Sequence, residues 1–523
     1  MDFKKTTLGI ELGSTKIKGV LLDEGHNIIA SGSYDWENRL EDGVWTYSLD
    51  EVHEGIRACY RLLSQDVAEK FGEPLSTVGA IGVSGMMHGY LAFDAAGELL
   101  VPFRTWRNTI TGEAAERLTA LFGFNVPQRW SVAHLYQAVL NGEEHLPRLD
   151  HITTLAGYLH ERLTGVRVLG IGEASGVFPI DSENLCYDRA MLAKLNGLLA
   201  PYGFPWTAED VLPAILPAGE QAGALTAEGA AFLDPTGTLK PGIPFAPPEG
   251  DAGTGMTATN SVRLYTGNVS AGTSDFAMVV VDHLPGLHRE IDMVTTPDGL
   301  PVAMVHCNNC TSDINAWAGL FADFLAAAGF DLPDRQLYDL LFKAALRGDP
   351  DCGGLLSYNY FSGEGITDVN EGRPVFLRSP DAKITFPNFM RTHLLSALAT
   401  LKIGLDILTD EEKLRIDKLL GHGGFFRVEE AGQRMLSAAA GVPVTVMKTA
   451  GSGGPYGMAL LAAYMLNRAP GESLADYLDN RVFASAESST LMASQEDIDG
   501  FNAFLARYRA AFPVELAAIE TLR

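Results

Sequence analysis

One aspartate near the middle of the chain has a setting that suits proton transfer. Asp251 stands in the segment PPEGDAG, residues 247–253, and precedes a run of Ala, Gly, Thr and Met that predicts a helix start. A lone Asp among glycines is most often a turn residue that caps nearby N–H groups. Beside a domain boundary, however, its carboxylate would be placed to accept a proton from an attacking hydroxyl. Asp251 is therefore the candidate general base of a phosphoryl transfer.

Two loops combine glycine with hydroxyl side chains. The segments GST, residues 13–15, and GTS, residues 272–274, each follow an apolar run. Glycine lets a backbone approach a phosphate closely, while neighbouring N–H and O–H groups donate to it. Lys16 could add a positive charge beside the β- or γ-phosphate, although a solvated strand residue is an equally good interpretation. The two loops are candidate phosphate-binding loops.

A polar cluster of a different kind follows a predicted strand. In SGMMHG, residues 84–89, His88 would lie at the carboxyl end of the strand, where open α/β sheets bind ligands. Trp106, with polar neighbours in WRN, suits a sugar, whose faces are apolar and whose edges are polar. The structural alternatives are a hydrogen-bonded core histidine and a half-buried tryptophan. These residues are candidates for sugar contact.

Two glycine clusters in the second half could lie against a flat base. They are GHGG, residues 421–424, and GSGGPYG, residues 451–457, which opens onto an apolar helix expected over residues 458–466. The second cluster lacks the preceding strand and the downstream acid of a dinucleotide-binding motif, so that interpretation is rejected. The remaining hypothesis is that these glycines line the adenine-binding part of a nucleotide site.

The elements that must position these residues can be outlined from periodicity. Apolar runs predict strands over residues 8–12, 17–22, 27–33 and 78–84, and a helix over residues 49–70. A hairpin followed by a helix and a strand fits a mixed sheet better than a purely parallel one. Further along, leucines at spacings of four and three predict one amphipathic helix from Met390 to Leu408, with its stripe in the core.

The first hairpin has a counterpart in the second half of the chain. GSTKIKGVLLD, residues 13–23, and GTSDFAMVVVD, residues 272–282, match at a constant offset of 259 residues. Because that offset is about half the chain, a duplicated domain is the simplest interpretation, with two unrelated hairpins as the alternative. A length of 523 residues also favours two domains over one. The Pro- and Gly-rich stretch over residues 234–257 places the boundary near 262, giving domains 1–262 and 263–523.

Charge and cysteine content narrow the possible partners. With 39 Lys and Arg against 65 Asp and Glu, the formal net charge is -26. That charge opposes binding to nucleic acid and docking on anionic membranes. The five cysteines are odd in number and show no disulfide framework, and no signal peptide or membrane span is expected. Reduced thiols and a cytoplasmic location follow. The CNNC segment, residues 307–310, is interpreted as structural over metal-binding or redox-active.

Taken in order, these motifs resemble the FGGY family of carbohydrate kinases. LGIELGSTKIKGVLLD resembles the family's first phosphate loop, IGVSGMMHG is similar to the sugar loop of xylulokinases, and EGDAGTGM resembles the segment with the catalytic Asp. NVSAGTSDF, GHGGFFRVEEAGQRMLSAAAGVPV and AGSGGPYGMALLAAY continue the pattern through residue 465. The resemblance implies an actin-like (ribonuclease H-like) duplicated α/β fold that transfers the ATP γ-phosphate to a sugar hydroxyl, with Mg²⁺, in an interdomain cleft.

The resemblance also assigns roles to individual residues, with the base role falling to Asp251. Sugar contact is implied for Met87, His88, Trp106, Asn108 and Asp251. Nucleotide contact is implied for Gly13, Ser14, Thr15, Lys16, Gly272, Thr273, Ser274, Gly423, Gly424 and Gly453. Metal binding is implied for Glu11 and Asp251. In this division the first domain binds the sugar and the second binds the nucleotide.

Departures from the family pattern concern the substrate more than the reaction. Glu11 stands where the family usually has Asp, Asn108 replaces an acidic sugar contact, and Met86 replaces a Gln. A ketopentose such as xylulose, or a related ketose or polyol, is the expected substrate. Ribulose, gluconate and glycerol remain open, as does a non-catalytic ATPase or sugar sensor. A homodimer is also left open.

Overall fold

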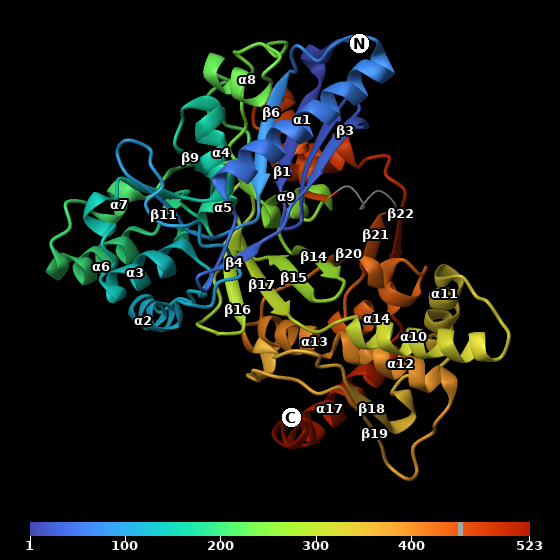
Figure 1. The fold of residues 1–523 in the computed structure, drawn as a ribbon. Helices are drawn as coiled ribbons and strands as arrows, with labels where there is room; N and C mark the ends of the chain where they lie inside the picture. Colours follow the sequence, from blue (N-terminus) through green and yellow to red (C-terminus); the bar gives the residue numbers. More distant parts are fainter. Residues whose placement is uncertain (448–452, 523) are drawn as a thin grey trace. The chain divides into compact units, whose positions relative to one another are not determined.

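The computed structural model describes residues 1–447 and 453–522 (Figure 1). Within them the chain forms two compact units. The first unit comprises residues 1–262, 292–302 and 453–485, and the second comprises the remaining described residues. Two segments from the second half of the sequence, 292–302 and 453–485, are therefore part of the first unit. The chain passes between the units several times.

The first unit is built on a five-stranded mixed sheet in the order β13-β6-β1-β2-β3. The strands of this sheet are β1 (Thr7–Leu12), β2 (Lys16–Leu22), β3 (Ile28–Asp35), β6 (Ala80–Gly85) and β13 (Glu249–Gly250). β1 pairs antiparallel with β2 and parallel with β6. Helix α1 (Leu49–Phe71) packs along β3 (Figure 1). The predicted strands and helix of this region are confirmed, with small shifts at their ends.

A helix from late in the sequence completes this unit. α15 (Gly453–Asn467) packs against β1 and against α9 (Asp251–Ala258). The approach is so close that a Cβ atom added to Gly9 would lie 2.1 Å from the Pro455 carbonyl oxygen. One added to Gly457 would lie 1.9 Å from the Thr254 carbonyl oxygen. Glycine is therefore required on both sides of this contact.

The rest of the first unit is a second hydrophobic core around short strands and helices. The further helices of the unit are α2 (Gly112–Phe122), α3 (Ser131–Asn141), α4 (Leu155–Thr164), α5 (Ile171–Ala174), α6 (Arg189–Leu199), α7 (Ala208–Val211), α8 (Ala227–Leu233) and α16 (Leu474–Tyr477). The short strands are β4 (Arg39–Glu41), β5 (Val44–Thr46), β7 (Leu91–Phe93), β8 (His151–Thr153), β9 (Val168–Gly170), β10 (Ile180–Asp181), β11 (Cys186–Tyr187) and β12 (Ala214–Leu216).

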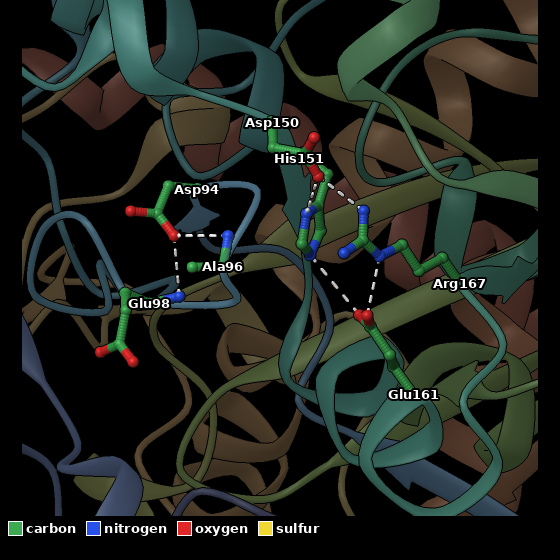
Figure 2. Close-up of polar contacts among 7 residues, drawn as sticks. All are labelled: Asp94, Ala96, Glu98, Asp150, His151, Glu161 and Arg167. Atoms are coloured by element: carbon green, nitrogen blue, oxygen red, sulfur yellow. Dashed lines mark hydrogen bonds and ion pairs between the residues drawn. The ribbon is translucent and has the colours of Figure 1, made fainter.

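A polar network joins β8 to α4 in this part of the molecule (Figure 2). His151 lies between two carboxylates, 3.1 Å from Asp150 and 3.5 Å from Glu161. Arg167 binds the same two acids, at 2.6 Å and 2.7 Å. In the adjoining turn, Asp94 accepts hydrogen bonds from two backbone N–H groups. Every carboxylate of this network has a donor.

The second unit is built on a seven-stranded sheet whose central strands repeat the pairing of the first sheet. Its sheet has the order β16-β17-β15-β14-β20-β21-β22. These strands are β14 (Thr266–Ala271), β15 (Asp275–Val280), β16 (Ile291–Thr295), β17 (Pro301–Cys307), β20 (Lys418–His422), β21 (Val444–Met447) and β22 (Ser488–Leu491). Most of β16 and the beginning of β17 fall in the segment 292–302, which is counted with the first unit although it pairs in this sheet. As in the first sheet, the leading strand β14 pairs antiparallel with the next strand and parallel with a later one, β20.

The two matching hairpins differ by one residue in register. β14 begins 259 residues after β1, as the repeat predicts. In the first hairpin Leu12 pairs with Ile17, which leaves a turn of four residues. In the second, Ala271 pairs with Asp275, which leaves a turn of three. The second loop is therefore tighter, although the sequence offset is constant.

The remaining elements of the second unit are mostly helical. They are α10 (Ser312–Ala327), α11 (Asp334–Ala345), β18 (Leu355–Tyr358), β19 (Val375–Arg378), α12 (Phe386–Ala397), α13 (Ala399–Asp406), α14 (Ala431–Ala440) and α17 (Gln495–Thr521). The expectation of one helix from Met390 to Leu408 is wrong, because the chain divides at Leu398 into α12 and α13. There the Leu398 N–H bonds to the Leu395 carbonyl, a tighter turn than the α-helix makes. The predicted leucine stripe is nevertheless fully buried.

Two further properties of the described chain bear on its environment. None of its helices combines the length and apolar character that crossing a membrane requires. All five cysteines are free thiols. Cys307 and Cys310 are buried, and the Cys310 N–H donates to the Thr273 carbonyl at 2.9 Å. The CNNC segment thus supports the second glycine-hydroxyl loop.

Candidate active site

Asp251 is the first residue of α9 and follows β13 directly. Its side chain reaches solvent, and one carboxylate oxygen accepts the Met87 backbone N–H at 3.1 Å. The surrounding protein removes enough water to raise the pKa of this carboxyl above its usual range, against the hydrogen bonds that favour ionisation. An accessible carboxylate with a raised pKa and a fixed orientation has the properties of a proton acceptor.

Two more acids are buried directly behind Asp251. Glu249 is 1% exposed and accepts the backbone N–H groups of Gly172 and Glu173 at 3.2 Å and 2.9 Å. Burial raises the pKa of Glu249 to about 8. Glu173 is fully buried, and burial raises its pKa well above the usual range, although the Thr154 side chain beside its carboxylate acts in the opposite direction. A Cβ atom added to Gly250 would lie 2.4 Å from a Glu173 carboxylate oxygen and 2.9 Å from Met87 Cγ, so a side chain there would displace both residues.

Glu11, at the end of β1, is the fourth acid of this group. Burial, together with the nearby charge of Asp251, raises its pKa to about 7. Gly454 at the start of α15 leaves room for it, since a Cβ atom there would lie 2.0 Å from a Glu11 oxygen. No group of three or more metal-ligating side chains occurs in the described residues. Mg²⁺ commonly takes only one or two carboxylates plus substrate phosphates, so Glu11 and Asp251 fit the implied metal.

The first glycine-hydroxyl loop lies in the same unit, and aromatic residues hold its carbonyl groups. Trp36 donates its indole N–H to the Gly13 carbonyl at 2.7 Å, and the Tyr47 hydroxyl donates to the Ser14 carbonyl at 2.7 Å. The two rings stack with their centroids 4.2 Å apart. Lys16 forms an exposed ion pair with Asp35 at 2.9 Å. With its carbonyl groups occupied, the loop keeps the Thr15 hydroxyl for a ligand, whereas the Ser14 hydroxyl faces the Met86 sulfur at 4.0 Å.

The second loop has a similar construction in the second unit. Thr311 donates to the Gly272 carbonyl through both its N–H, at 3.0 Å, and its hydroxyl, at 2.7 Å. Gly423 lies against the strand that leads into this loop, because a Cβ atom there would be 2.4 Å from the Ala271 carbonyl oxygen. Gly424 has open space at its Cβ position. Gly423 and Gly424 are thus brought to the loop of Gly272, Thr273 and Ser274, as one nucleotide site requires.

The predicted sugar contacts are unequal in accessibility. Trp106 is 39% exposed, whereas Asn108 is 2% exposed. The Asn108 amide accepts the Trp45 N–H at 2.8 Å and donates to the carbonyl groups of Trp45 and Thr105 at 2.8 Å and 3.0 Å. Its hydrogen bonds therefore all go to backbone, and a sugar contact would require it to exchange partners. A carboxylate at this position would face two carbonyl oxygens.

The last predicted nucleotide contact lies in an unexpected place. Gly453 begins α15 and is part of the first unit, not of the second as the division at residue 262 implied. Its Cβ position is open. The preceding members of its cluster, Gly451 and Ser452, lie outside the described residues. Whether Gly453 touches adenosine stays a prediction.

Sequence reasoning missed an arginine beside the sugar loop. Arg129 donates its Nε–H to His88 Nε2 at 3.1 Å and forms an ion pair with Asp292. Asp292 also accepts from the Asn125 side chain at 2.9 Å. The local sequence carries no signal for this set, because its members come from separate loops and from a segment in the second half of the chain.

Comparisons with known proteins agree with this arrangement. The profile of the FGGY family of carbohydrate kinases matches over both parts, its N-terminal domain at residues 6–256 and its C-terminal domain at residues 267–466. A xylulose kinase of Lactococcus lactis is 25% identical over 211 residues, which is 36% of this chain and 39% of that protein. The alignment with this relative thus spans well under half its length.

Solved structures show the same fold over almost the whole chain. A xyloylose kinase from Brucella ovis superimposes with a TM-score of 0.77 and 20% identity, covering 98% of this chain and all of its own. A gluconate kinase from Lactobacillus acidophilus gives a TM-score of 0.76 and 16% identity, covering 97% and 98%.

The duplicated actin-like α/β architecture and the family matches define a carbohydrate kinase, a phosphotransferase of the class that uses ATP. The chain belongs to the FGGY family of carbohydrate kinases. The predicted fold and enzyme class are confirmed.

Proposed function

We propose that this kinase transfers the γ-phosphate of ATP to a hydroxyl of a neutral sugar, a ketopentose such as xylulose. The observation that carries the proposal is the setting of Asp251, whose carboxylate is accessible and is held by the Met87 N–H beside His88. A xylulose kinase among the sequence relatives and another among the solved structures support the choice of sugar.

In the proposed reaction Asp251 takes the proton of the attacking hydroxyl. The new bond joins that oxygen to the γ-phosphorus, and the bond to the departing ADP breaks. Asp251 would then release its proton to solvent, which its side chain reaches. Burial around Asp251 keeps its proton affinity raised, which favours its role as the proton acceptor.

The first loop would hold phosphate oxygens through Ser14, Thr15 and the backbone of Gly13, with Lys16 at its edge. The second unit would hold the nucleotide through Thr273, Ser274 and the glycines Gly423 and Gly424. Mg²⁺, when bound, would offset negative charge on the phosphates, and Glu11 and Asp251 are the residues that would hold it. The first unit is thus proposed as the sugar-binding part and the second as the nucleotide-binding part.

Two alternatives are testable beside this proposal. The L. acidophilus gluconate kinase has nearly the same TM-score as the B. ovis protein, so a sugar acid is a competing substrate. A sugar sensor that closes on ligands without transfer would need no base. Asp251, with its raised pKa, favours the enzyme over the sensor.

The deciding experiment measures ADP release from the purified protein with ATP, Mg²⁺ and a panel of sugars. The panel contains D-xylulose, D-ribulose, D-gluconate and glycerol at equal concentrations. We expect the highest kcat/KM for a ketopentose. Gluconate as the best substrate would overturn the choice of sugar, and ADP release that no compound of a wider sugar panel stimulates would favour the sensor.

A further inference from the structure

The imidazole ring of His88 has no nitrogen left for a substrate in this structure. Its Nδ1 faces the Gly176 carbonyl at 3.2 Å, and because a carbonyl only accepts, Nδ1 must carry the ring hydrogen. Its Nε2 must then be the acceptor for the Arg129 Nε–H at 3.1 Å. Burial, and then the charge of Arg129, lowers the pKa of His88 well below its usual range, so the ring stays neutral. Both ring nitrogens are engaged by protein.

The Arg129 guanidinium has more N–H donors than its contacts in the described chain use. Its Nε–H goes to His88 and one terminal nitrogen pairs with Asp292, and these are its polar contacts within the described chain. A guanidinium carries five N–H donors, so the Nη1 group remains available. About a quarter of the side chain, 26%, is exposed. His88 and Asp292 thus fix the guanidinium from two sides and leave one edge open.

Arg129 lies close to the site of Asp251. His88 follows Met87, whose N–H holds Asp251, and the charge of Arg129 lowers the pKa of Asp251 against the effect of burial. A planar guanidinium edge suits two adjacent oxygens. The Arg129 charge is already balanced by Asp292, and the carboxylates of Asp251 and Glu11 lie in the same region. A negatively charged sugar would therefore find no unbalanced positive charge.

We propose that Arg129 is the residue that binds the sugar at this position, donating to two vicinal oxygens of a neutral ketose, and that His88 acts through Arg129 as a positioning residue. Asp292 sets the preference for a neutral sugar by balancing the arginine charge. The proposal rests on the proposed function for its substrate class. It reassigns the sugar contact that the family resemblance implies for His88.

The first test measures sugar binding by calorimetry without ATP, together with KM and kcat, for Arg129→Met. Loss of hydrogen bonds from a charged donor should weaken D-xylulose binding and raise its KM about 10- to 100-fold, with the KM for ATP within twofold of wild type. Arg148→Met, which breaks an exposed arginine–aspartate pair at 2.7 Å in the same unit, is the matched control and should leave both values unchanged. Arg129→Lys, which keeps the charge but not the two-donor edge, replaces Arg129→Met if that variant does not fold.

The second test separates positioning from contact. His88→Asn should weaken sugar binding in the wild-type background but change it less than twofold in the Arg129→Met background. Equal costs in both backgrounds, or sugar binding within twofold of wild type in folded Arg129→Met and Arg129→Lys, would overturn the proposal.

The third test addresses the charge balance. Asp292→Asn removes the balancing charge, so the ratio of kcat/KM for D-gluconate over D-xylulose should rise at least tenfold. An unchanged ratio would overturn the role of Asp292. A wild-type protein that binds a neutral sugar through Arg129 but transfers no phosphate would refute the proposed function and leave this inference intact.

Discussion

Two groups of carboxylates in the first unit have opposite environments. Around the candidate base, Glu11, Glu173, Glu249 and Asp251 form no ion pair in the described chain, and the pKa of each is raised, chiefly by burial. In the network of Figure 2, Asp150 and Glu161 share His151 and Arg167.

The pKa shifts of the second group run the other way. A hydrogen bond from Arg167 lowers the pKa of Asp150. Burial opposes ionisation of Glu161, but His151 and Arg167 outweigh it and its pKa is lowered too. The paired acids are held ionised and join β8 to α4. The acids without an ion pair can accept a proton or bind a cation. The difference in pairing, not in residue type, separates a candidate reactive group from a structural one.

The largest difference in activity between the two groups of carboxylates should come from replacing Asp251, the candidate base. Asp251→Asn keeps the oxygen that accepts the Met87 N–H but cannot take a proton, so sugar phosphorylation should fall about 10²- to 10⁴-fold. Steady-state ADP release measures the loss, and ATP binding should stay within a few-fold of wild type. Asp94→Asn, from the paired region, is the matched control and should keep its activity. A variant of Asp251 with more than a tenth of wild-type turnover would contradict its role.

Replacing Glu11 should change both the Mg²⁺ requirement and the pH dependence of activity. Glu11→Gln keeps the shape but loses the charge, so half-saturation with Mg²⁺ should require about tenfold more metal. Because the pKa of Glu11 is about 7, protons should compete with Mg²⁺ as pH falls below 7 in the wild type. Titration of activity with Mg²⁺ at pH 6 and pH 8 measures both effects. A Glu11→Gln variant with the wild-type Mg²⁺ requirement at both pH values would exclude Glu11 as a ligand.

Glu173 should lower the stability of the fold as pH rises, because it ionises in the unfolded state while it stays protonated in the folded one. Its pKa in the folded protein lies well above its unfolded value, so the folded state binds the extra proton and wild-type stability falls as pH rises above about 4.5. Glu173→Gln removes this loss. Denaturant unfolding should show the variant about 1–3 kcal/mol more stable at pH 8, with the difference disappearing near pH 4.5. A variant less stable than wild type at pH 8 would mean that the contact of Glu173 with the Thr154 side chain outweighs the cost of burying the acid.

Glu161 should show a smaller effect of opposite sign. Its pKa is lowered in the folded protein, so it contributes stability above its unfolded pKa and loses that contribution as pH falls through the folded value. Glu161→Gln should destabilise by about 0.5–1 kcal/mol at pH 7, since the group is partly exposed and screened. The same unfolding experiment at pH 7 and pH 3.5 should show the difference shrinking at the lower pH. A constant difference would assign the loss to packing.

Much of the fold could be read from the sequence, and the reasons for the exceptions are physical. The offset of 259 residues located the second hairpin, because apolar spacing and turn residues act locally. The offset did not predict the one-residue change in register, because Thr311 and Cys310, which hold the shorter turn, lie almost 40 residues away. The leucine stripe predicted burial but not the break at Leu398, because the spacing of buried residues continues through a tight turn.

The site was predictable to the extent that its motifs are continuous. Asp251, His88 and the two loops lie in short segments with clear composition, and in the structure Asp251 accepts the N–H of Met87, the neighbour of His88. Arg129 and Asp292 are 163 residues apart, and no local pattern links them. Asn108 was identified by its residue type, but its bonds to the backbone of Trp45 could not be predicted because they join separate loops.

The position of α15 has a consequence for how the protein is made. The first unit needs this helix against β1 and α9, yet the ribosome synthesises it roughly 190 residues after Val262. At typical elongation rates the first 262 residues wait about 10–40 s before their cover emerges. During that interval the face of β1 around Gly9, which accepts α15 at contact distance, is open to water and to chaperones. Nascent chains stopped before residue 453 should therefore be protease-sensitive and bind chaperones, and a gene cut at the middle should not yield a stable first half.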